Sequence, residues 1–190
     1  MDSSQRPPVV AVYGSSTLAE SDPAYGQVRQ LGAELAARNF SVMTGGYGGA
    51  MAAASRGASE ADGHVIGVTT ELFESRGGAN PWVRERVHTP DIFERLRYLL
   101  READAFVAVT GSIGTLTEVF LTWTLLSVPA RRPAPLVLMG AHWRAWLDAH
   151  SGAEFVPQRL FQWVEVAETP AGTADRVAAA LARARTGATA

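Results

Sequence analysis

A chain of 190 residues, of which 47% are hydrophobic, is long enough to bury the core of one domain and too short for two well-packed domains. Its formal net charge of −2 argues against binding to a nucleic-acid polymer, because such binding depends on an excess of cationic side chains. The chain has no cysteine and all 17 of its basic residues are arginine, which excludes disulfides, thiolate metal sites and any reaction that needs a lysine amine.

Short β-branched runs alternate along the chain with longer amphipathic segments. This alternation is typical of βαβ units and predicts an α/β fold, with a parallel sheet covered by helices on both faces. The predicted strands are Val9–Tyr13, Ser41–Thr44, His64–Val68, Ala105–Val109, Leu136–Met139 and Trp163–Val166. The predicted helices are Tyr25–Arg38, Ala50–Glu60, Asp91–Glu102, Thr115–Leu126, His142–Ala149 and Thr173–Arg185.

The remaining segments complete the predicted domain organisation. We expect a single domain over residues 9–186, with flexible ends at 1–8 and 187–190. The stretch Glu74–Pro90 has the least regular pattern, and we predict a functional loop there. The first residues show no basic segment followed by an apolar one, and no apolar run approaches the ~20 residues of a membrane span, so we expect a cytoplasmic protein.

Three of the predicted strands end in turns rich in glycine. The turns read GSS after Tyr13, GGYGG after Thr44 and TGSIG after Val109. The carboxyl ends of parallel strands meet at one edge of the sheet, and helices that begin there direct free N–H groups into the same space. Each turn alone is also typical of an ordinary turn or helix cap. Together they predict a site for an anion such as phosphate.

Glu118 follows Thr115 by three residues, and this spacing supports two interpretations. In the first, the two side chains form a capping box that closes the start of their helix. In the second, the carboxylate lies in the first helical turn beside the phosphate site, within reach of a sugar attached to that phosphate. The sequence leaves both open.

Arg95 lies at the edge of the apolar stripe of its predicted helix. The spacing alone favours a surface position, with the guanidinium paired to Asp91 one turn earlier. The alternative is that Arg95 points along the edge of the sheet into the site, as a cation for phosphate or as a partner for Glu118.

The predicted helix Thr115–Leu126 is apolar around most of its circumference, and such a helix must be covered on several sides. A second copy of the chain would supply that cover, so we expect a homodimer. The four histidines show no metal-ligand spacing, and we predict neither a metal site nor a cofactor.

Three segments resemble motifs of the Lonely Guy (LOG) family. The segment TGGYGGAM at Thr44–Met51, with the residues that follow it to Ala58, is similar to the family's TGGGPGIMEAANRGA. The segment Thr110–Glu118 is similar to its PGGxGTxxE motif, and Glu94-Arg95 stands at the spacing of its ERK element. The resemblance covers roughly residues 9–150 in order, which is more specific than any single motif.

This resemblance implies a single-domain Rossmann-like three-layer fold and a homodimeric nucleoside 5′-monophosphate phosphoribohydrolase. Such an enzyme hydrolyses the N-glycosidic bond of AMP or of a cytokinin riboside monophosphate to the free base and ribose 5-phosphate, without a cofactor. The resemblance implies that Arg95 and Glu118 are the catalytic pair. The phosphate- and nucleotide-binding residues that it implies are Gly14, Ser15, Gly45, Gly46, Met51, Gly111, Ser112, Gly114 and Thr115.

The chain departs from the family motifs at Ala52, Leu96, Thr110 and Ser112, where the family has glutamate, lysine, proline and glycine. A serine at 112 adds a side chain beside the ligand, so it either narrows the phosphate site or supplies another donor. These departures leave a second function open, that of a non-catalytic nucleotide or nucleotide-cofactor binder similar to the molybdenum-cofactor carriers. A dinucleotide-dependent oxidoreductase has less support, because no GxGxxG follows the first strand.

Overall fold

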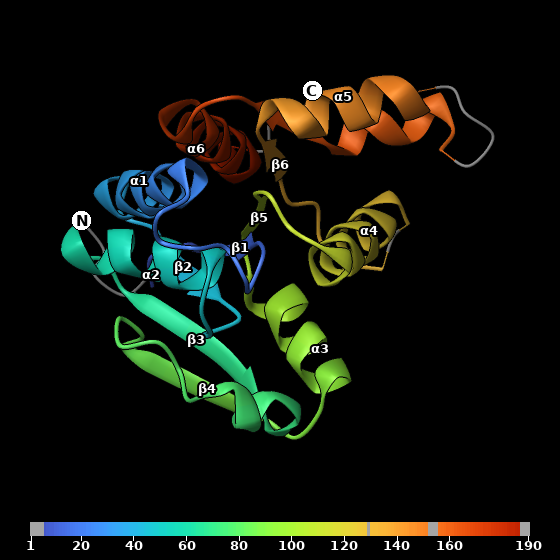
Figure 1. The fold of residues 1–190 in the computed structure, drawn as a ribbon. Helices are drawn as coiled ribbons and strands as arrows, with labels where there is room; N and C mark the ends of the chain where they lie inside the picture. Colours follow the sequence, from blue (N-terminus) through green and yellow to red (C-terminus); the bar gives the residue numbers. More distant parts are fainter. Residues whose placement is uncertain (1–5, 129, 152–155, 187–190) are drawn as a thin grey trace.

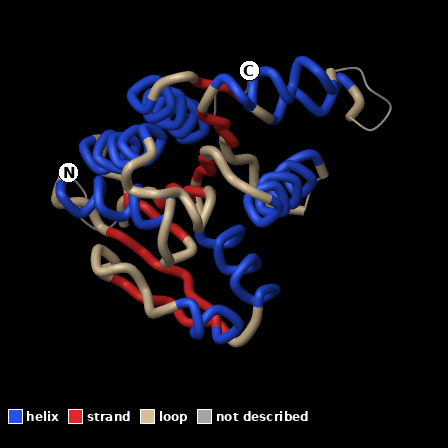
Figure 2. Tube along the Cα trace, in the orientation of Figure 1, coloured by secondary structure: helices blue, strands red, loops and turns tan. Residues whose placement is uncertain are grey.

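The computed structural model describes residues 6–128, 130–151 and 156–186, and it contains one sheet of seven parallel strands between two layers of helices (Figure 1). Strands and helices alternate along the chain (Figure 2), which confirms the predicted α/β class. The predicted flexible ends lie outside the described residues at 1–5 and 187–190. The strands are β1 (Val9–Tyr13), β2 (Ser41–Thr44), β3 (Val65–Thr70), β4 (Glu85–Thr89), β5 (Ala105–Ala108), β6 (Leu136–Met139) and β7 (Glu165–Ala167). The helices are α1 (Pro23–Ala37), α2 (Ala50–Glu60), α3 (Ile92–Glu102), α4 (Ile113–Ser127), α5 (Ala141–His150) and α6 (Pro170–Thr186), with short 3-10 helices η1 (Glu71–Arg76) and η2 (Gln158–Trp163).

The strands lie in the order β4-β3-β2-β1-β5-β6-β7, so the order reverses at β1. This central strand pairs in parallel with β2 on one side and β5 on the other. A ligand-binding crevice in an open parallel sheet forms where the order reverses, outside the carboxyl ends of the strands. The glycine-rich turns after β1, β2 and β5 therefore meet at that crevice, as the sequence predicted.

Alternate residues of β1 pack into two separate hydrophobic cores, one on each face of the sheet. Val10 and Val12 contribute to the core under α1, α2 and α6, whereas Ala11 and Tyr13 contribute to the core under α3, α4 and α5. All five residues of β1 are buried, as expected for a parallel strand that is covered on both faces. Because Tyr13 points toward α4, its side chain reaches the helix that carries Glu118.

The prediction of a loop over Glu74–Pro90 is wrong for its second half, because this stretch contains β4. β4 pairs with β3 at the edge of the sheet, and three of its five residues are exposed. An exposed edge strand with the sequence ERVHT lacks the apolar run that marks a buried strand. The six predicted strands are confirmed, with shifts of one or two residues at some ends.

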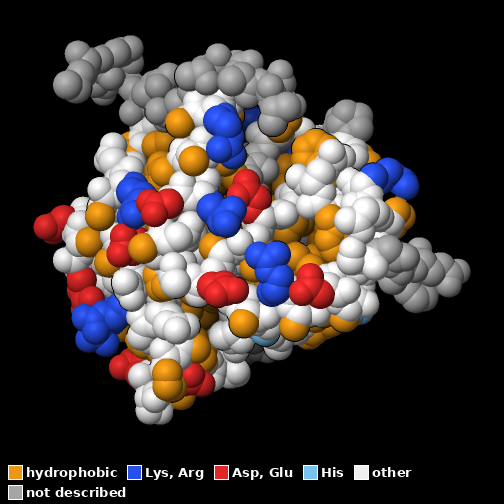
Figure 3. All heavy atoms as spheres, turned by 90° about the horizontal axis from the view of Figure 1, so that it is seen from above, with side chains coloured by type: hydrophobic (Ala, Val, Ile, Leu, Met, Phe, Trp, Pro, Cys, Tyr) orange, Lys and Arg blue, Asp and Glu red, His pale blue; other side chains and the backbone are white. Residues whose placement is uncertain are grey.

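The surface seen in Figure 3 carries acidic and basic side chains in alternation, with no large patch of one sign on that face. This distribution agrees with the net charge of −2. Within the described ranges, no helix combines the length and the hydropathy that crossing a membrane requires.

Candidate active site

A cavity of about 350 Å³ opens at the carboxyl edge of the sheet, where the strand order reverses. Its walls come from the turns after β1, β2 and β5, from η1, and from the helices α3 and α4. The residues that line it are Val12, Tyr13, Gly14, Ser16, Gly45, Tyr47, Met51, Phe73, Arg95, Ser112, Ile113, Gly114, Thr115 and Glu118.

Most of the site residues implied by the sequence line this cavity, and three, Ser15, Gly46 and Gly111, do not. Ser15 fixes the turns to one another, since its N–H donates to Thr110 O at 3.0 Å. Gly46 accepts bonds from the amide and the side chain of Asn80. A Cβ at Gly111 would lie 2.1 Å from Oγ1 of Thr115, so this glycine lets the turn fold closely against the helix.

Arg95 points into the cavity from α3 and is only 6% exposed. Its Nε donates to Val68 O at 2.8 Å, and its Nη1 lies 3.7 Å from Oε1 of Glu118. The surface pairing with Asp91 favoured by spacing alone is wrong, because the Asp91 carboxylate caps α3 by accepting from the N–H of Glu94. The alternative interpretation of Arg95, as a partner for Glu118, is the one that the structure bears out.

Gly45 makes room for this guanidinium. A Cβ at position 45 would lie 1.8 Å from Nη2 of Arg95 and 2.6 Å from the sulfur of Met51. Any side chain there would overlap the arginine, so the glycine after β2 and the arginine of α3 depend on each other.

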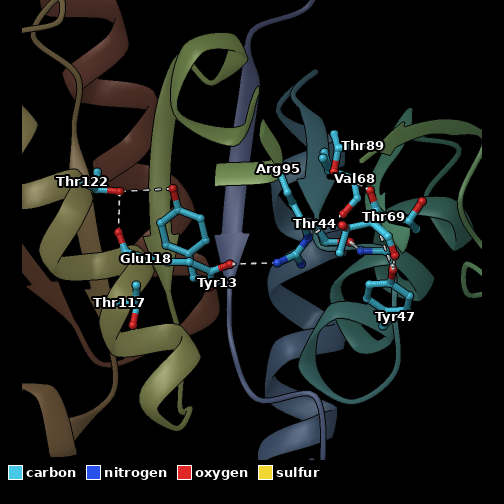
Figure 4. A network of polar contacts seen from close by, with 12 residues as sticks. Tyr13, Thr44, Tyr47, Val68, Thr69, Thr89, Arg95, Thr117, Glu118 and Thr122 are labelled. Carbon is cyan, nitrogen blue, oxygen red and sulfur yellow. Dashed lines mark hydrogen bonds and ion pairs between the residues drawn. The ribbon is translucent and has the colours of Figure 1, made fainter. Parts of the chain in front are cut away.

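Glu118 faces Arg95 from α4, with 13% of its side chain exposed (Figure 4). Burial raises the pKa of the Glu118 carboxyl from 4.5 to about 7, while the nearby charge of Arg95 opposes part of this rise. The capping box predicted as one alternative is not formed. α4 begins at Ile113, which places Thr115 within the first turn rather than at the cap.

The first turn of α4 provides unused hydrogen-bond donors beside this pair. Ser112 is the N-cap but makes no side-chain cap bond, and the first helical bond across this turn runs from Leu116 N–H to Ser112 O. The amides of Ile113, Gly114 and Thr115 therefore have no partner within the helix. Unbonded amides and the positive end of a helix dipole are the features that attract an anion, and here they border Glu118.

A chain of hydroxyl groups connects β1 to the turn of α4 that carries Glu118 (Figure 4). Thr122 Oγ1 donates to Glu118 O at 2.7 Å and lies 3.2 Å from the Tyr13 hydroxyl. Burial raises the pKa of Tyr13 far above its usual range, so this hydroxyl keeps its proton and donates to Thr122. The chain holds the backbone of Glu118 and leaves its carboxylate to face Arg95.

Sequence reasoning missed the aromatic residues of the site, Tyr13, Tyr47 and Phe73. Tyr47 is the one residue with a large side chain in the turn GGYGG, where the resembling motif has glycine, and this was the signal available. Phe73 comes from η1, directly before the stretch Glu74–Pro90 that was predicted to be a functional loop. Among the described side chains of 77–90, none lines the cavity.

Comparison with known proteins accounts for this arrangement of glycine turns, arginine and glutamate. The sequence profile of the SLOG cluster4 family matches residues 7–127, which is more than half of the chain. The chain belongs to the SLOG cluster4 family. This result confirms the resemblance to LOG proteins, and the matched region contains every residue of the cavity.

Curated relatives of this SLOG cluster4 protein carry names of nucleotide-cleaving enzymes. The pyrimidine/purine nucleotide 5′-monophosphate nucleosidase of Escherichia coli K12 is 30% identical over 145 residues, which cover 72% of this chain and 32% of the relative. The cytokinin riboside 5′-monophosphate phosphoribohydrolase of Mycobacterium tuberculosis is 31% identical over 124 residues, covering 63% of this chain and 66% of the relative. The chain thus spans about a third of the first relative's length.

Solved structures with the same fold include proteins that bind the molybdenum cofactor. The molybdenum cofactor binding protein of Rippkaea orientalis superposes with a TM-score of 0.72 at 21% identity, covering 93% of this chain and 98% of that protein. The molybdenum cofactor carrier protein of Chlamydomonas reinhardtii gives a TM-score of 0.69 at 25% identity, covering 93% and 99%.

Proposed function

We propose that this SLOG cluster4 protein hydrolyses the N-glycosidic bond of nucleoside 5′-monophosphates, releasing the free base and ribose 5-phosphate. The observation that carries the proposal is the pairing of buried Arg95 with Glu118 at 3.7 Å, directly beside the free amides of α4. The names of the E. coli and M. tuberculosis relatives support it, since both describe nucleotide monophosphate substrates.

In the proposed mechanism the phosphate binds to the first turn of α4, which places the pentose beside Glu118. Cleavage of the bond between C1′ and the base nitrogen develops positive charge on the pentose, and the Glu118 carboxylate stabilises this charge and orients the attacking water. Water supplies the hydroxyl that bonds to C1′ and the proton that leaves with the base. Arg95 holds Glu118 in place and balances the negative charge of the site.

The deprotonated form of Glu118 is the working form in this mechanism. Since the pKa of Glu118 is about 7, activity should increase as the pH is raised through about 7. A profile of kcat/KM against pH reports this ionisation in the free enzyme. A profile that is flat between pH 5 and 9 would contradict the role of Glu118.

Incubation with a panel of purine and pyrimidine monophosphates, followed by chromatography of the free bases, tests the proposal. We expect turnover that Glu118→Gln lowers about 10²- to 10⁴-fold, the range for loss of an acid–base group. Glu60→Gln is the matched control, because Glu60 lies on the exposed end of α2, paired with Arg29. No turnover of any monophosphate, or full turnover by Glu118→Gln, would refute the hydrolase.

The second candidate is a non-catalytic carrier of a nucleotide or nucleotide cofactor. The fold shared with the Chlamydomonas carrier and the substituted positions Thr110 and Ser112 favour it. A carrier would show a higher melting temperature with ligand, because a ligand that binds only the folded state stabilises it, but it would not release free base. Glu118→Gln would then leave the shift in melting temperature unchanged.

We also propose that the protein is a homodimer, as the apolar composition of α4 suggested. Ile113 at the start of this helix is 78% exposed and Val128 directly after its end is 44% exposed, so apolar surface is present at both ends of α4. Light scattering at micromolar concentration tests this, and a monomer mass would contradict it.

A further inference from the structure

The cavity changes character along its length, from backbone amides at one end to aromatic rings at the other. The amide end is the turn after β5 with the start of α4, where Ser112 and Thr115 lie. The aromatic end comprises Tyr47, in the turn after β2, and Phe73, in η1 after β3. β5 and β3 are three strand positions apart. β2, which precedes Tyr47, is two strand positions from β5, so the two ends lie on opposite sides of the central strand β1.

Arg95 and Glu118 lie between these two ends. Figure 4 shows the guanidinium between Glu118 on one side and Tyr47 on the other. From one end of the cavity to the other, the order is therefore the amides of α4, the Glu118 carboxylate, the Arg95 guanidinium and the aromatic rings. A nucleoside monophosphate carries its phosphate, pentose and base in the matching order, so a phosphate on α4 and a pentose at Glu118 direct the base toward the rings.

The aromatic end is held in a fixed position by the backbone of β3. The Tyr47 hydroxyl donates to Thr70 O at 3.0 Å and accepts from Thr70 N–H at 2.9 Å. Its ring meets the ring of Phe73 edge to face, with centroids 5.9 Å apart. Each ring also lies 6.0 Å from the guanidinium carbon of Arg95. Tyr47 is 8% exposed, so its ring cannot turn away from the cavity without breaking both bonds to Thr70.

Several polar groups at this end already bond within the protein. The Tyr47 hydroxyl donates to Thr70 O and accepts from Thr70 N–H, Nε of Arg95 donates to Val68 O, and Nη1 of Arg95 lies 3.7 Å from Glu118. Among the described side chains that line this end, Met51 adds a thioether and Phe73 a ring. The rings of Tyr47 and Phe73 and the thioether of Met51 offer the face of a base apolar contact and do not distinguish the donors and acceptors on its edge. Every nucleobase has such a face, so stacking of this kind tolerates different bases.

We propose that Tyr47 and Phe73 form the nucleobase subsite of this cavity, and that the subsite accepts purines and pyrimidines alike. The inference rests on the proposed function, because it assumes that a nucleoside monophosphate occupies the cavity. The substrates would then be nucleoside monophosphates with either a purine or a pyrimidine base.

The test separates binding of the base from binding of the sugar phosphate. Calorimetry on Glu118→Gln gives dissociation constants for AMP, CMP and ribose 5-phosphate, which lacks a base. We expect AMP and CMP to bind within about tenfold of each other and both more tightly than ribose 5-phosphate, since stacking contributes about 5- to 100-fold per base. Adding Tyr47→Ala should remove most of this advantage and leave the affinity for ribose 5-phosphate unchanged.

Three further variants test whether the base contribution to affinity comes from the aromatic rings of the subsite. Tyr47→Phe keeps the ring and should restore the advantage of AMP and CMP over ribose 5-phosphate. Phe73→Ala, in η1 outside the sheet, gives the same test if Tyr47→Ala does not fold. Tyr98→Ala is the matched control, because its ring lies on α3 beside Arg101, outside the lining of the cavity.

The base subsite is refuted if AMP binds more than about a hundredfold more tightly than CMP, or if the ring variants leave the base contribution intact. Turnover by the wild-type protein is measured in parallel. Base binding that depends on Tyr47, without turnover, would support the subsite and refute the hydrolase. Turnover confined to one base would refute the subsite and support the hydrolase.

Discussion

Two helices begin at the carboxyl edge of the sheet directly after a glycine-rich turn, and their first turns are used differently. At α2 the Ala50 N–H donates to Ser15 O at 2.7 Å, and a Cβ at Gly49 would lie 2.2 Å from the same oxygen. At α4 the N-cap Ser112 makes no side-chain bond, and a Cβ at Gly114 would meet no atom within 4 Å. Glycine content is therefore the same signal at both turns, but the first amide of α2 is bonded to the turn after β1, whereas the first turn of α4 has open space beside its unbonded amides.

The largest expected effect is on stability, when alanine replaces the glycine of the crowded turn. Gly49 has a φ of +66°, and a Cβ added at this position would overlap Ser15 O. Backbone strain and overpacking together should lower the free energy of unfolding of Gly49→Ala by about 2–4 kcal/mol. Urea unfolding of the variant and the wild type at one pH measures this difference.

Gly114→Ala is the matched control for Gly49→Ala. The position lies in the first turn of α4 with open space around it, so alanine should gain up to about 1 kcal/mol from its higher helix propensity. Because Gly114 lines the cavity, an added methyl group takes up space beside the proposed phosphate position, and the cost should fall on phosphate affinity. Equal destabilisation by the two substitutions would show that the turns do not differ as described.

The second expected effect concerns the acid that borders the open helix start. The pKa of Glu118 is about 7 in the folded protein against 4.5 ordinarily, so between these values the folded state holds a proton that the unfolded chain has released. The free energy of unfolding should therefore fall as pH rises through this window, by about 3 kcal/mol at most. Unfolding in urea at pH 5 and pH 8 measures the difference, from which Glu118→Gln should remove the contribution of Glu118.

Glu60→Gln is the control for this pH effect. Bonds from Arg29 and Arg56 lower the pKa of Glu60, so its contribution to stability is lost only as pH falls below the ordinary range of a carboxyl group. The difference between pH 5 and pH 8 should be the same in this variant as in the wild type. If Glu118→Gln also retains the full difference, burial does not raise the Glu118 pKa.

The fold could be predicted from the sequence because buried parallel strands are continuous apolar runs. Six strands and their order along the chain follow from that pattern, and their glycine turns predict the edge of the sheet at which the cavity opens. β4 could not be found in this way, because an edge strand exposed to solvent needs no apolar run. Patterns of hydropathy report burial, and they miss an element that is not buried.

The placement of Arg95 shows how far the candidate site could be predicted from local sequence patterns. Helix periodicity assigns it to the edge of an apolar stripe, where surface pairing is common. Its actual position depends on a carbonyl of β3 at Val68 and on the space left by Gly45 after β2. Both lie far from α3 in the sequence, so only the family motifs, and not the local pattern, indicated that Arg95 enters the site.

A smaller effect distinguishes the serines at the two turns. Ser112 lines the cavity beside the free amides, whereas the Ser15 hydroxyl accepts from Thr17 N–H at 3.1 Å and does not line the cavity. Ser112→Ala should weaken binding of ribose 5-phosphate about tenfold if its hydroxyl donates to the phosphate, and Ser15→Ala should change it less than about twofold. Calorimetry measures both dissociation constants. A larger loss of affinity with Ser15→Ala than with Ser112→Ala would assign the phosphate to the turn after β1.

The smallest effect is expected from the hydroxyl chain that holds α4 one turn beyond its open start. α2 is fixed by contacts of its own first turn, whereas α4 is fixed through Tyr13 and Thr122 to the backbone of Glu118. Tyr13→Phe removes one hydroxyl but keeps the ring stacked on Phe106 at 6.0 Å, and Thr122 still bonds to Glu118 O. We therefore expect kcat to fall only about two- to fivefold, with KM unchanged. Thr122→Ser, which keeps the hydroxyl, should lose less, and a rise in KM with Tyr13→Phe would mean that Tyr13 binds substrate rather than positions Glu118.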